Sequence, residues 1–220
     1  HPKMGRLALL CSAYIQVGSN CNRNMTKEEF KTFWTLTYPD TIPISYLFKK
    51  DYSERWFRIH SLPDSKRYAE SENEWKILLE RQNQIITDIF GENEKILLVT
   101  GEYNWDENAT FNADEEAVFK PYDFILLDNI DLFDFKSEDY NKGDFYKPAF
   151  AETIWNSNQH DRLLKEIAND NLRAFFISIN KSVIVAPNDS GIDIVFKNIQ
   201  TKDFYKKQYE NWLSERVDGL

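Results

Sequence analysis

Cysteine is almost absent from this sequence. The 220 residues contain two, Cys11 and Cys21, and none follows the first 24 positions. A disulfide framework is therefore excluded for the body of the chain, which we expect to fold in a reducing cytoplasm. Long apolar runs are missing as well, because runs such as residues 183–187 are far shorter than the roughly 20 residues of a membrane-spanning helix. We therefore expect no transmembrane segment and no membrane partner.

Glycine and histidine are scarce, with seven and three copies. Neither GxGxxG nor GxxxxGK[ST] occurs, so the glycine-rich turns that cradle phosphates in nucleotide-binding folds are missing. HExxH, CxxC and GxSxG are missing too, which removes common signatures of zinc sites, reactive thiols and serine nucleophiles. The sequence thus offers no catalytic residue, no metal site and no cofactor, and we expect a binding protein rather than an enzyme.

The charge of the chain is strongly acidic, with 36 acidic and 27 basic residues and a net charge of -9. This balance disfavours nucleic acid as a partner and favours a basic protein. The length and the apolar content of 42% fit one ordered domain with a sizeable core. We expect that domain to span residues 25–220, since MTKEEF from Met25 onward opens a helix capped by Thr26. Residues 1–24 are expected to be an added or flexible leader.

Hydrophobic periodicity predicts four helices, at residues 26–38, 71–90, 157–168 and 201–216. In the second, Ser71 and Glu74 form a capping box, an apolar stripe starts at Trp75, and Gly91 ends the helix. Strand patterns occur at residues 55–59, 95–100, 122–130 and 150–155.

The C-terminal third contains the strand patterns LRAFFISI, VIVAP and GIDIVF. The turn sequences Asn180-Lys181 and Asn188-Asp189-Ser190-Gly191 separate them and predict an antiparallel three-stranded meander. The predicted fold class is therefore α+β, with a mixed or antiparallel sheet, helices packed on one face, and the meander followed by a helix.

A basic segment stands out in this acidic chain. Residues 49–67 hold six cations and three acids, a local balance of +3. Guanidinium, ammonium, imidazole and hydroxyl groups close together could bind a phosphate or a carboxylate. The alternative is a structural network in which these cations pair with acids of the chain itself. The candidate anion-binding residues are Arg55, Arg58, His60, Ser61, Ser65, Lys66 and Arg67.

An acidic segment follows at residues 102–144, with thirteen acids and three lysines. Aromatic side chains alternate with these acids, a combination favoured at protein interfaces. The alternative is a solvated acidic face whose aromatic residues belong to the core. The candidate partner-binding residues are Tyr103, Trp105, Asp106, Glu107, Asp131, Phe133, Asp134 and Phe135.

Three stretches resemble a family of uncharacterised bacterial proteins: ERWFRIHSLPDSKRYAE at residues 54–70, VIVAPNDSGIDIVF at residues 183–196, and NWLSERVDGL at the end. The family motifs are ERWxRIHSLPxSKRYA, APxDxGxDI and WLS, and in most members the later motif reads as an aromatic residue, an Asp and two glycines. Here Asn188, Asp189, Ser190 and Gly191 occupy that turn. The resemblance implies an α+β cytoplasmic protein and implies no known catalytic residues.

Two classes of function remain open. One is a non-enzymatic binding protein, toxin-neutralising or immunity-like, whose acidic aromatic surface attracts a basic partner. The other is an enzyme or sensor that binds a small phosphorylated or carboxylated ligand at residues 55–67. A concave pocket where Arg58, His60 and Lys66 converge would favour the second class.

Overall fold

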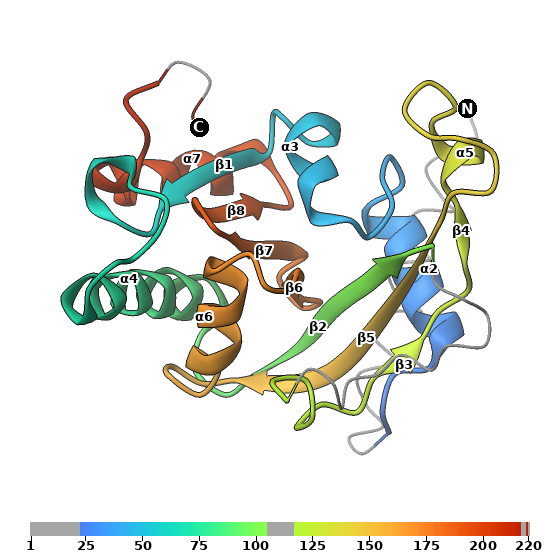
Figure 1. Ribbon diagram of the computed structural model, residues 1–220, viewed down its shortest axis with the longest axis horizontal. Helices are drawn as coiled ribbons and strands as arrows, with labels where there is room; N and C mark the ends of the chain where they lie inside the picture. Colours follow the sequence, from blue (N-terminus) through green and yellow to red (C-terminus); the bar gives the residue numbers. More distant parts are fainter. Residues whose placement is uncertain (1–22, 105–116, 217–218, 220) are drawn as a thin grey trace, which may run out of the picture.

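Strands of the chain form one eight-stranded antiparallel sheet in the computed structural model, which describes residues 23–104, 117–216 and 219. The strand order is β1-β8-β7-β6-β2-β5-β3, and β4 also pairs with β5 (Figure 1). This arrangement confirms the predicted α+β class. The strands are Trp56–His60 (β1), Glu94–Tyr103 (β2), Ile125–Leu126 (β3), Ile130–Asp131 (β4), Phe145–Trp155 (β5), Ala174–Ser178 (β6), Val183–Asn188 (β7) and Gly191–Val195 (β8).

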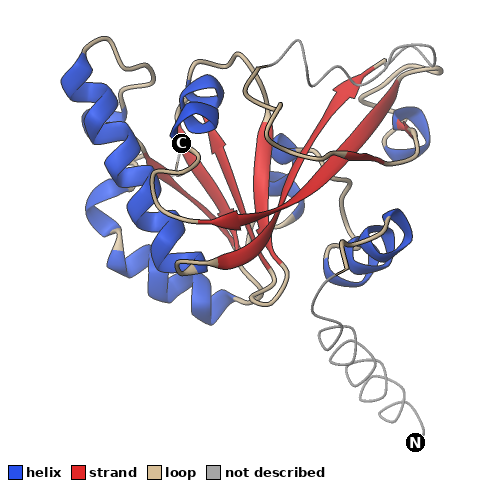
Figure 2. Ribbon diagram, turned by 90° about the horizontal axis from the view of Figure 1, so that it is seen from below, coloured by secondary structure: helices blue, strands red, loops and turns tan. Residues whose placement is uncertain are grey.

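Helices cover both faces of the sheet, as Figure 2 shows, and not the single face that the sequence predicts. On one face α4, α6 and α7 enclose a core that includes Ile96 and Leu98 of β2. On the other face α2 and α3 pack over Leu97 and Val99. Both alternating sets of β2 side chains are apolar, so this strand is buried on two sides and needs two helical layers.

The helical segments have the following bounds. The α-helices are Lys27–Thr37 (α2), Phe48–Asp51 (α3), Glu72–Phe90 (α4), Leu132–Phe135 (α5), Asp161–Ala168 (α6) and Ile199–Gln208 (α7). Single 3-10 turns are Ser45–Leu47 (η1), Pro63–Ser65 (η2) and Glu210–Trp212 (η3). None of the described helices is long and apolar enough to cross a membrane. The predicted leader, residues 1–24, lies outside the described residues except for its last two positions.

Helix α4 begins and ends close to where the sequence predicts. Ser71 Oγ accepts the Glu74 N–H at 3.3 Å, while the Glu74 carboxylate accepts the backbone N–H of Glu70 at 2.7 Å instead of that of Ser71. Gly91 ends the helix with a φ of +83°, a conformation that glycine adopts without a steric penalty. The buried stripe starts at Leu78 rather than at Trp75, which is only half-buried.

The predicted meander is confirmed as β6-β7-β8, and its second turn is tightly built. Asn188 Oδ1 accepts the N–H groups of Ser190 at 2.9 Å and Gly191 at 3.1 Å. Gly191 lies opposite His60 on the edge strand β1. A Cβ atom on Gly191 would lie 1.9 Å from the carbonyl oxygen of Ile59, so only glycine allows β1 to approach β8 this closely.

Two predicted elements differ from the structure. The strand expected at residues 122–130 is reduced to the two-residue strands β3 and β4, which pair only with β5 at the edge of the sheet. The helix expected at residues 201–216 ends at Gln208, because Tyr209 leaves helical geometry, is buried, and donates its hydroxyl to Asp88. Phe204 of this helix is 63% exposed.

Candidate functional site

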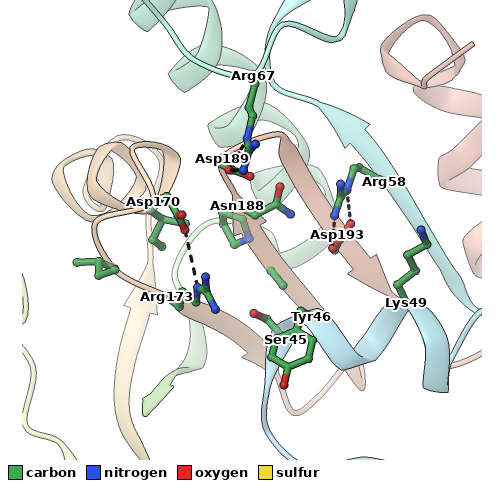
Figure 3. Close-up of a pocket in the computed structure, with 14 residues that line it drawn as sticks. Ser45, Tyr46, Lys49, Arg58, Arg67, Asp170, Arg173, Asn188, Asp189 and Asp193 are labelled. Carbon is green, nitrogen blue, oxygen red and sulfur yellow. Dashed lines mark hydrogen bonds and ion pairs between the residues drawn. The ribbon is translucent and has the colours of Figure 1, made fainter. Parts of the chain in front are cut away.

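A cavity of about 380 Å³ lies on the α3 side of the sheet, where η1 faces the turn between β7 and β8. Figure 3 shows its charged side chains around a central hollow, from Arg67 at one end to Tyr46 at the other. The lining consists of Ser45, Tyr46, Lys49, Arg58, Arg67, Ile167, Asp170, Leu172, Arg173, Ala186, Pro187, Asn188, Asp189 and Asp193. Four of these residues are cationic and three are aspartates.

The first ion pair of the lining joins Arg58 to Asp193 on the neighbouring strands β1 and β8. Arg58 Nε donates to Asp193 Oδ1 at 2.6 Å and Nη2 donates to Oδ2 at 2.8 Å. Burial by itself would lower the pKa of Arg58, but the hydrogen bonds and charge of Asp193 raise it above its usual value. Asp193 also lies opposite Ala186 of β7, whose small side chain leaves room for the cavity.

The second ion pair joins Arg67 to Asp189 in the β7–β8 turn (Figure 3). Arg67 Nε donates to Asp189 Oδ2 at 2.5 Å, and Nη2 contacts the same oxygen. Burial would raise the pKa of Asp189, but the bonds from Arg67 and from the Ser190 hydroxyl hold it below its usual value. The Asn188 turn therefore positions a charged carboxylate that fixes Arg67 at the rim.

The two other cations of the lining are less closely paired with the described carboxylates. Arg173 Nε lies 3.8 Å from Asp170 Oδ1, which is too long for a charge-assisted hydrogen bond. Lys49 forms no ion pair within the described part of the chain, and its Nζ lies 5.7 Å from the centroid of the Trp56 ring. The positive charge of the cavity is therefore concentrated on Lys49 and Arg173.

Of the seven predicted anion-binding residues, the cavity brings together Arg58 and Arg67. His60 is buried at the end of β1, and its ring nitrogens make no well-formed hydrogen bond to any described residue. Burial lowers its pKa, an effect that the Ser190 backbone opposes. Ser61 is buried as well and accepts a hydrogen bond from Gln82 Nε2 at 2.8 Å.

Arg55, Ser65 and Lys66 also lie outside the cavity lining. The Arg55 guanidinium lies 4.3 Å over the Tyr52 ring. Lys66 Nζ donates to Glu74 Oε1 at 2.6 Å, next to the start of α4, and Ser65 is exposed in η2. Lys66 thus pairs with an acid of the chain itself, as the alternative interpretation of the basic segment expects, whereas Arg55 contacts an aromatic ring.

A family model described as a domain of unknown function, DUF3885, matches residues 44–217. The chain belongs to this family. No curated protein and no solved structure matches it. An uncharacterised family, which the sequence resemblance predicts, is thus confirmed. Every residue that lines the cavity falls within the DUF3885 span, whereas α2 precedes its first residue.

The predicted acidic partner surface is only partly described, because Trp105, Asp106 and Glu107 lie outside the described residues. The structure places Tyr103 and Asp131 on the two sides of β5. Both side chains are exposed. Tyr103 lies opposite Tyr146, and Asp131 lies opposite Phe145, the preceding residue of β5, so the two side chains point to opposite faces of the sheet.

The remaining members of that surface belong to α5. Phe133 and Phe135 are half-buried, with the ammonium of Lys142 5.6 Å from the first ring and that of Lys136 4.9 Å from the second. Asp134 is exposed, and its backbone N–H is capped by the side chain of Asp131. The aromatic rings are thus partly covered by lysines of the same segment.

Other chemistry in the described residues has structural explanations. Ser178 and Lys181 have the spacing SxxK of a serine nucleophile and its base. Ser178 Oγ, however, donates to Glu94 Oε1 at 2.9 Å, and Lys181 Nζ donates to the carbonyl oxygens of Ile89 and Phe90 at the end of α4. The described residues contain no group of three or more His, Cys, Asp or Glu that could hold a metal ion.

Sequence reasoning missed Arg173, Asp193 and Tyr46 as residues of the cavity. Asp193 had a detectable signal, because it is the single charge within the apolar strand GIDIVF. A lone carboxylate on a buried strand needs a cationic partner. Arg58, in the strand pattern at residues 55–59, was a candidate for that partner. Arg173 and Tyr46 carried no signal, since only the sheet order brings them beside β7.

Proposed function

We propose that this chain binds a small anionic ligand, phosphorylated or carboxylated, in the cavity between η1 and the β7–β8 turn. The observation that carries the proposal is the charge of the lining. A protein with a net charge of -9 gathers four cations and three aspartates around one hollow, a local balance of +1. A cavity of about 380 Å³ also falls in the size range of small-molecule sites.

The two arginine–aspartate pairs leave part of each guanidinium available to an anion. The aspartates accept from Nε and Nη2 of Arg58 and Arg67, and no described residue bonds to either Nη1 group. Each guanidinium is therefore held in place while part of its donor fork stays available. A ligand that meets fixed donors loses less side-chain entropy on binding.

The test is ligand-dependent stabilisation of the folded chain by anions. A ligand that binds only the folded state stabilises it by RT ln(1 + [L]/Kd), which raises the unfolding temperature. Sodium phosphate should raise it along this logarithmic curve, with little effect below Kd and a steady rise per tenfold increase above it, whereas sodium chloride at equal ionic strength should not. Lys49→Met should weaken the phosphate effect at least about tenfold in apparent Kd, which corresponds to loss of one charge-assisted contact.

Lys50→Met is the matched control. Lys50 neighbours Lys49 in α3, is exposed, and does not line the cavity, so both variants change the net charge equally. Equal effects of the two substitutions, or a phosphate response no larger than the chloride response, would show that the cavity is not an anion site. Arg173→Gln provides a second cavity variant that leaves the buried Arg58–Asp193 pair intact.

A second candidate function is binding of a basic partner protein, of the toxin-neutralising or immunity-like kind. Its support is the group of exposed acids in and around α5, Asp131, Asp134, Glu138 and Asp139. Wild-type protein and an Asp131→Lys, Asp134→Lys variant would be used to capture partners from a cell extract. Loss of a basic protein with this variant, but not with the charge-matched Asp203→Lys, Glu210→Lys variant on α7 and η3, supports this function. Equal capture by all three proteins rules it out.

A further inference from the structure

Beyond Tyr46 lies a second hollow of about 20 Å³, which has room for about one water molecule, so a larger group at this end must lie on the exposed rings beside it. Ser45, Tyr46 and Arg173 line both spaces. The other residues of the second hollow come from the start of η1 and from β2, β5 and β6: Ile44, Thr100, Gly101, Tyr103, Tyr146 and Phe175. Among the described residues, Arg173 is the only charged one in its lining. A ligand held by the cations of the first space therefore meets uncharged, aromatic surface at the Tyr46 end.

The tyrosines at this end are exposed but held in place. Tyr46 is 48% exposed and Tyr103 is 41% exposed. The Tyr103 hydroxyl donates to the Tyr46 hydroxyl at 3.1 Å, and the Tyr46 hydroxyl also contacts that of Tyr140. The Tyr103 ring lies 5.0 Å from the ring of Tyr146, which is buried. Fixed aromatic rings offer contact area at a small entropic cost.

Gly101 leaves room for the Tyr146 ring at this point of the sheet. A Cβ atom at this position would lie 2.6 Å from the Tyr146 ring and 2.6 Å from the Lys147 carbonyl oxygen. The glycine thus lets the Tyr146 ring pack against β2. Because Tyr146 is buried, the aromatic surface open to a ligand beside Arg173 is that of Tyr46 and Tyr103, and the planar Arg173 guanidinium can itself stack on a ring.

We propose that the ligand of this cavity is an aromatic anion, in which a phosphate or carboxylate is carried on a planar ring. The anionic group faces Lys49, Arg58 and Arg67, and the ring packs against Tyr46 and Tyr103 beside Arg173. This inference rests on the proposed anion site and adds the class of molecule that the site selects.

The test compares matched pairs of probes that differ by a ring, using the full chain and isothermal titration. The pairs are phosphate with phenyl phosphate, acetate with benzoate, and ribose 5-phosphate with adenosine 5′-monophosphate. The ring-bearing member of at least one pair should bind about tenfold more tightly, as expected for one aromatic stacking contact. The pair with the largest ratio of dissociation constants shows whether the site prefers an aryl phosphate, an aryl carboxylate or a nucleotide.

The variants locate the ring. Tyr46→Ala should abolish the tenfold ratio while the ringless anion keeps its affinity, and Tyr46→Phe should retain most of the ratio. Phe204→Ala, which removes an exposed aromatic residue outside both linings, should change nothing.

The outcomes separate the two proposals. If anions with and without an aromatic ring bind equally, and Lys49→Met weakens the binding of both, the aromatic inference is wrong and the anion site is supported. The aromatic inference is also wrong if the Tyr46→Ala variant still prefers the anion that carries an aromatic ring. Absence of binding by all six probes would overturn the anion site together with the inference.

Discussion

Replacing both members of the Arg58–Asp193 pair should cost much less stability than the sum of the single replacements. Arg58→Ala leaves a carboxylate that is 7% exposed without its partner, which costs about 3–5 kcal/mol. Asp193→Ala leaves a guanidinium that is 15% exposed and borders a cavity water can enter, so the expected cost is about 2 kcal/mol. The double variant leaves no unpaired charge, and we expect a total cost of about 3 kcal/mol.

These values predict a coupling free energy of about 3 kcal/mol between Arg58 and Asp193. Urea unfolding of the wild type and the three variants, followed by tryptophan fluorescence, measures it. The control is the Lys76–Glu80 pair on α4, with a 3.8 Å separation and 71% and 64% exposed side chains. Its coupling should stay within the exposed-pair range of about 0 to 1 kcal/mol. An Arg58–Asp193 coupling no larger than that of this control would refute the argument that the pair fixes β1 on β8.

Three further predictions concern stability. Gly191→Ala should lower the free energy of unfolding by at least about 2 kcal/mol, because the new Cβ would overlap the Ile59 carbonyl oxygen and force β1 outward; urea titration measures this. Lys181→Met should cost about 1 kcal/mol in the same assay, since the last carbonyls of α4 lose a charged donor. Burial lowers the pKa of both His60 and His160 from 6.5. The stability that these neutral imidazoles contribute to the folded state is therefore complete above that pH and is lost as the pH falls below it. His160→Gln should flatten that part of the stability profile, and an unchanged slope would contradict the assignment.

Local patterns predict the parts of the fold that local physics determines. Helix α4 follows from a capping serine, an apolar stripe and Gly91, and the β6-β7-β8 meander follows from alternating apolar runs and asparagine turns. The covering of both faces was not predicted, although the unbroken apolar run of β2 contains the signal. The short strands β3 and β4 could not be predicted, because their pairing with β5 is set by long-range packing rather than by their own side chains.

The candidate site divides in the same way. The basic segment identifies Arg58 and Arg67, but it also includes His60 and Lys66, which the structure places in the interior and at the start of α4. Strand alternation predicts the side of β1 that Arg58 faces and cannot predict what lies opposite. Arg173 joins the cavity because β6 lies next to β7, and that neighbour relation is a property of the whole sheet.

Structural pairing and ligand binding need not be alternatives for the same arginine. Arg58 is buried in a bidentate pair, so its removal should act mainly on stability, whereas Lys49 has no ion pair in the described residues and its removal should act mainly on binding. Arg67 lies between these extremes, since it is 58% exposed but bonded to the half-buried Asp189. A ligand anion near Arg67 competes with Asp189 for the same guanidinium. Binding of the anion would therefore require the β7–β8 turn, which carries Asp189, to change conformation. Asp189→Asn should therefore tighten anion binding while it weakens the turn, and titration of phosphate against this variant measures the first effect separately from the second.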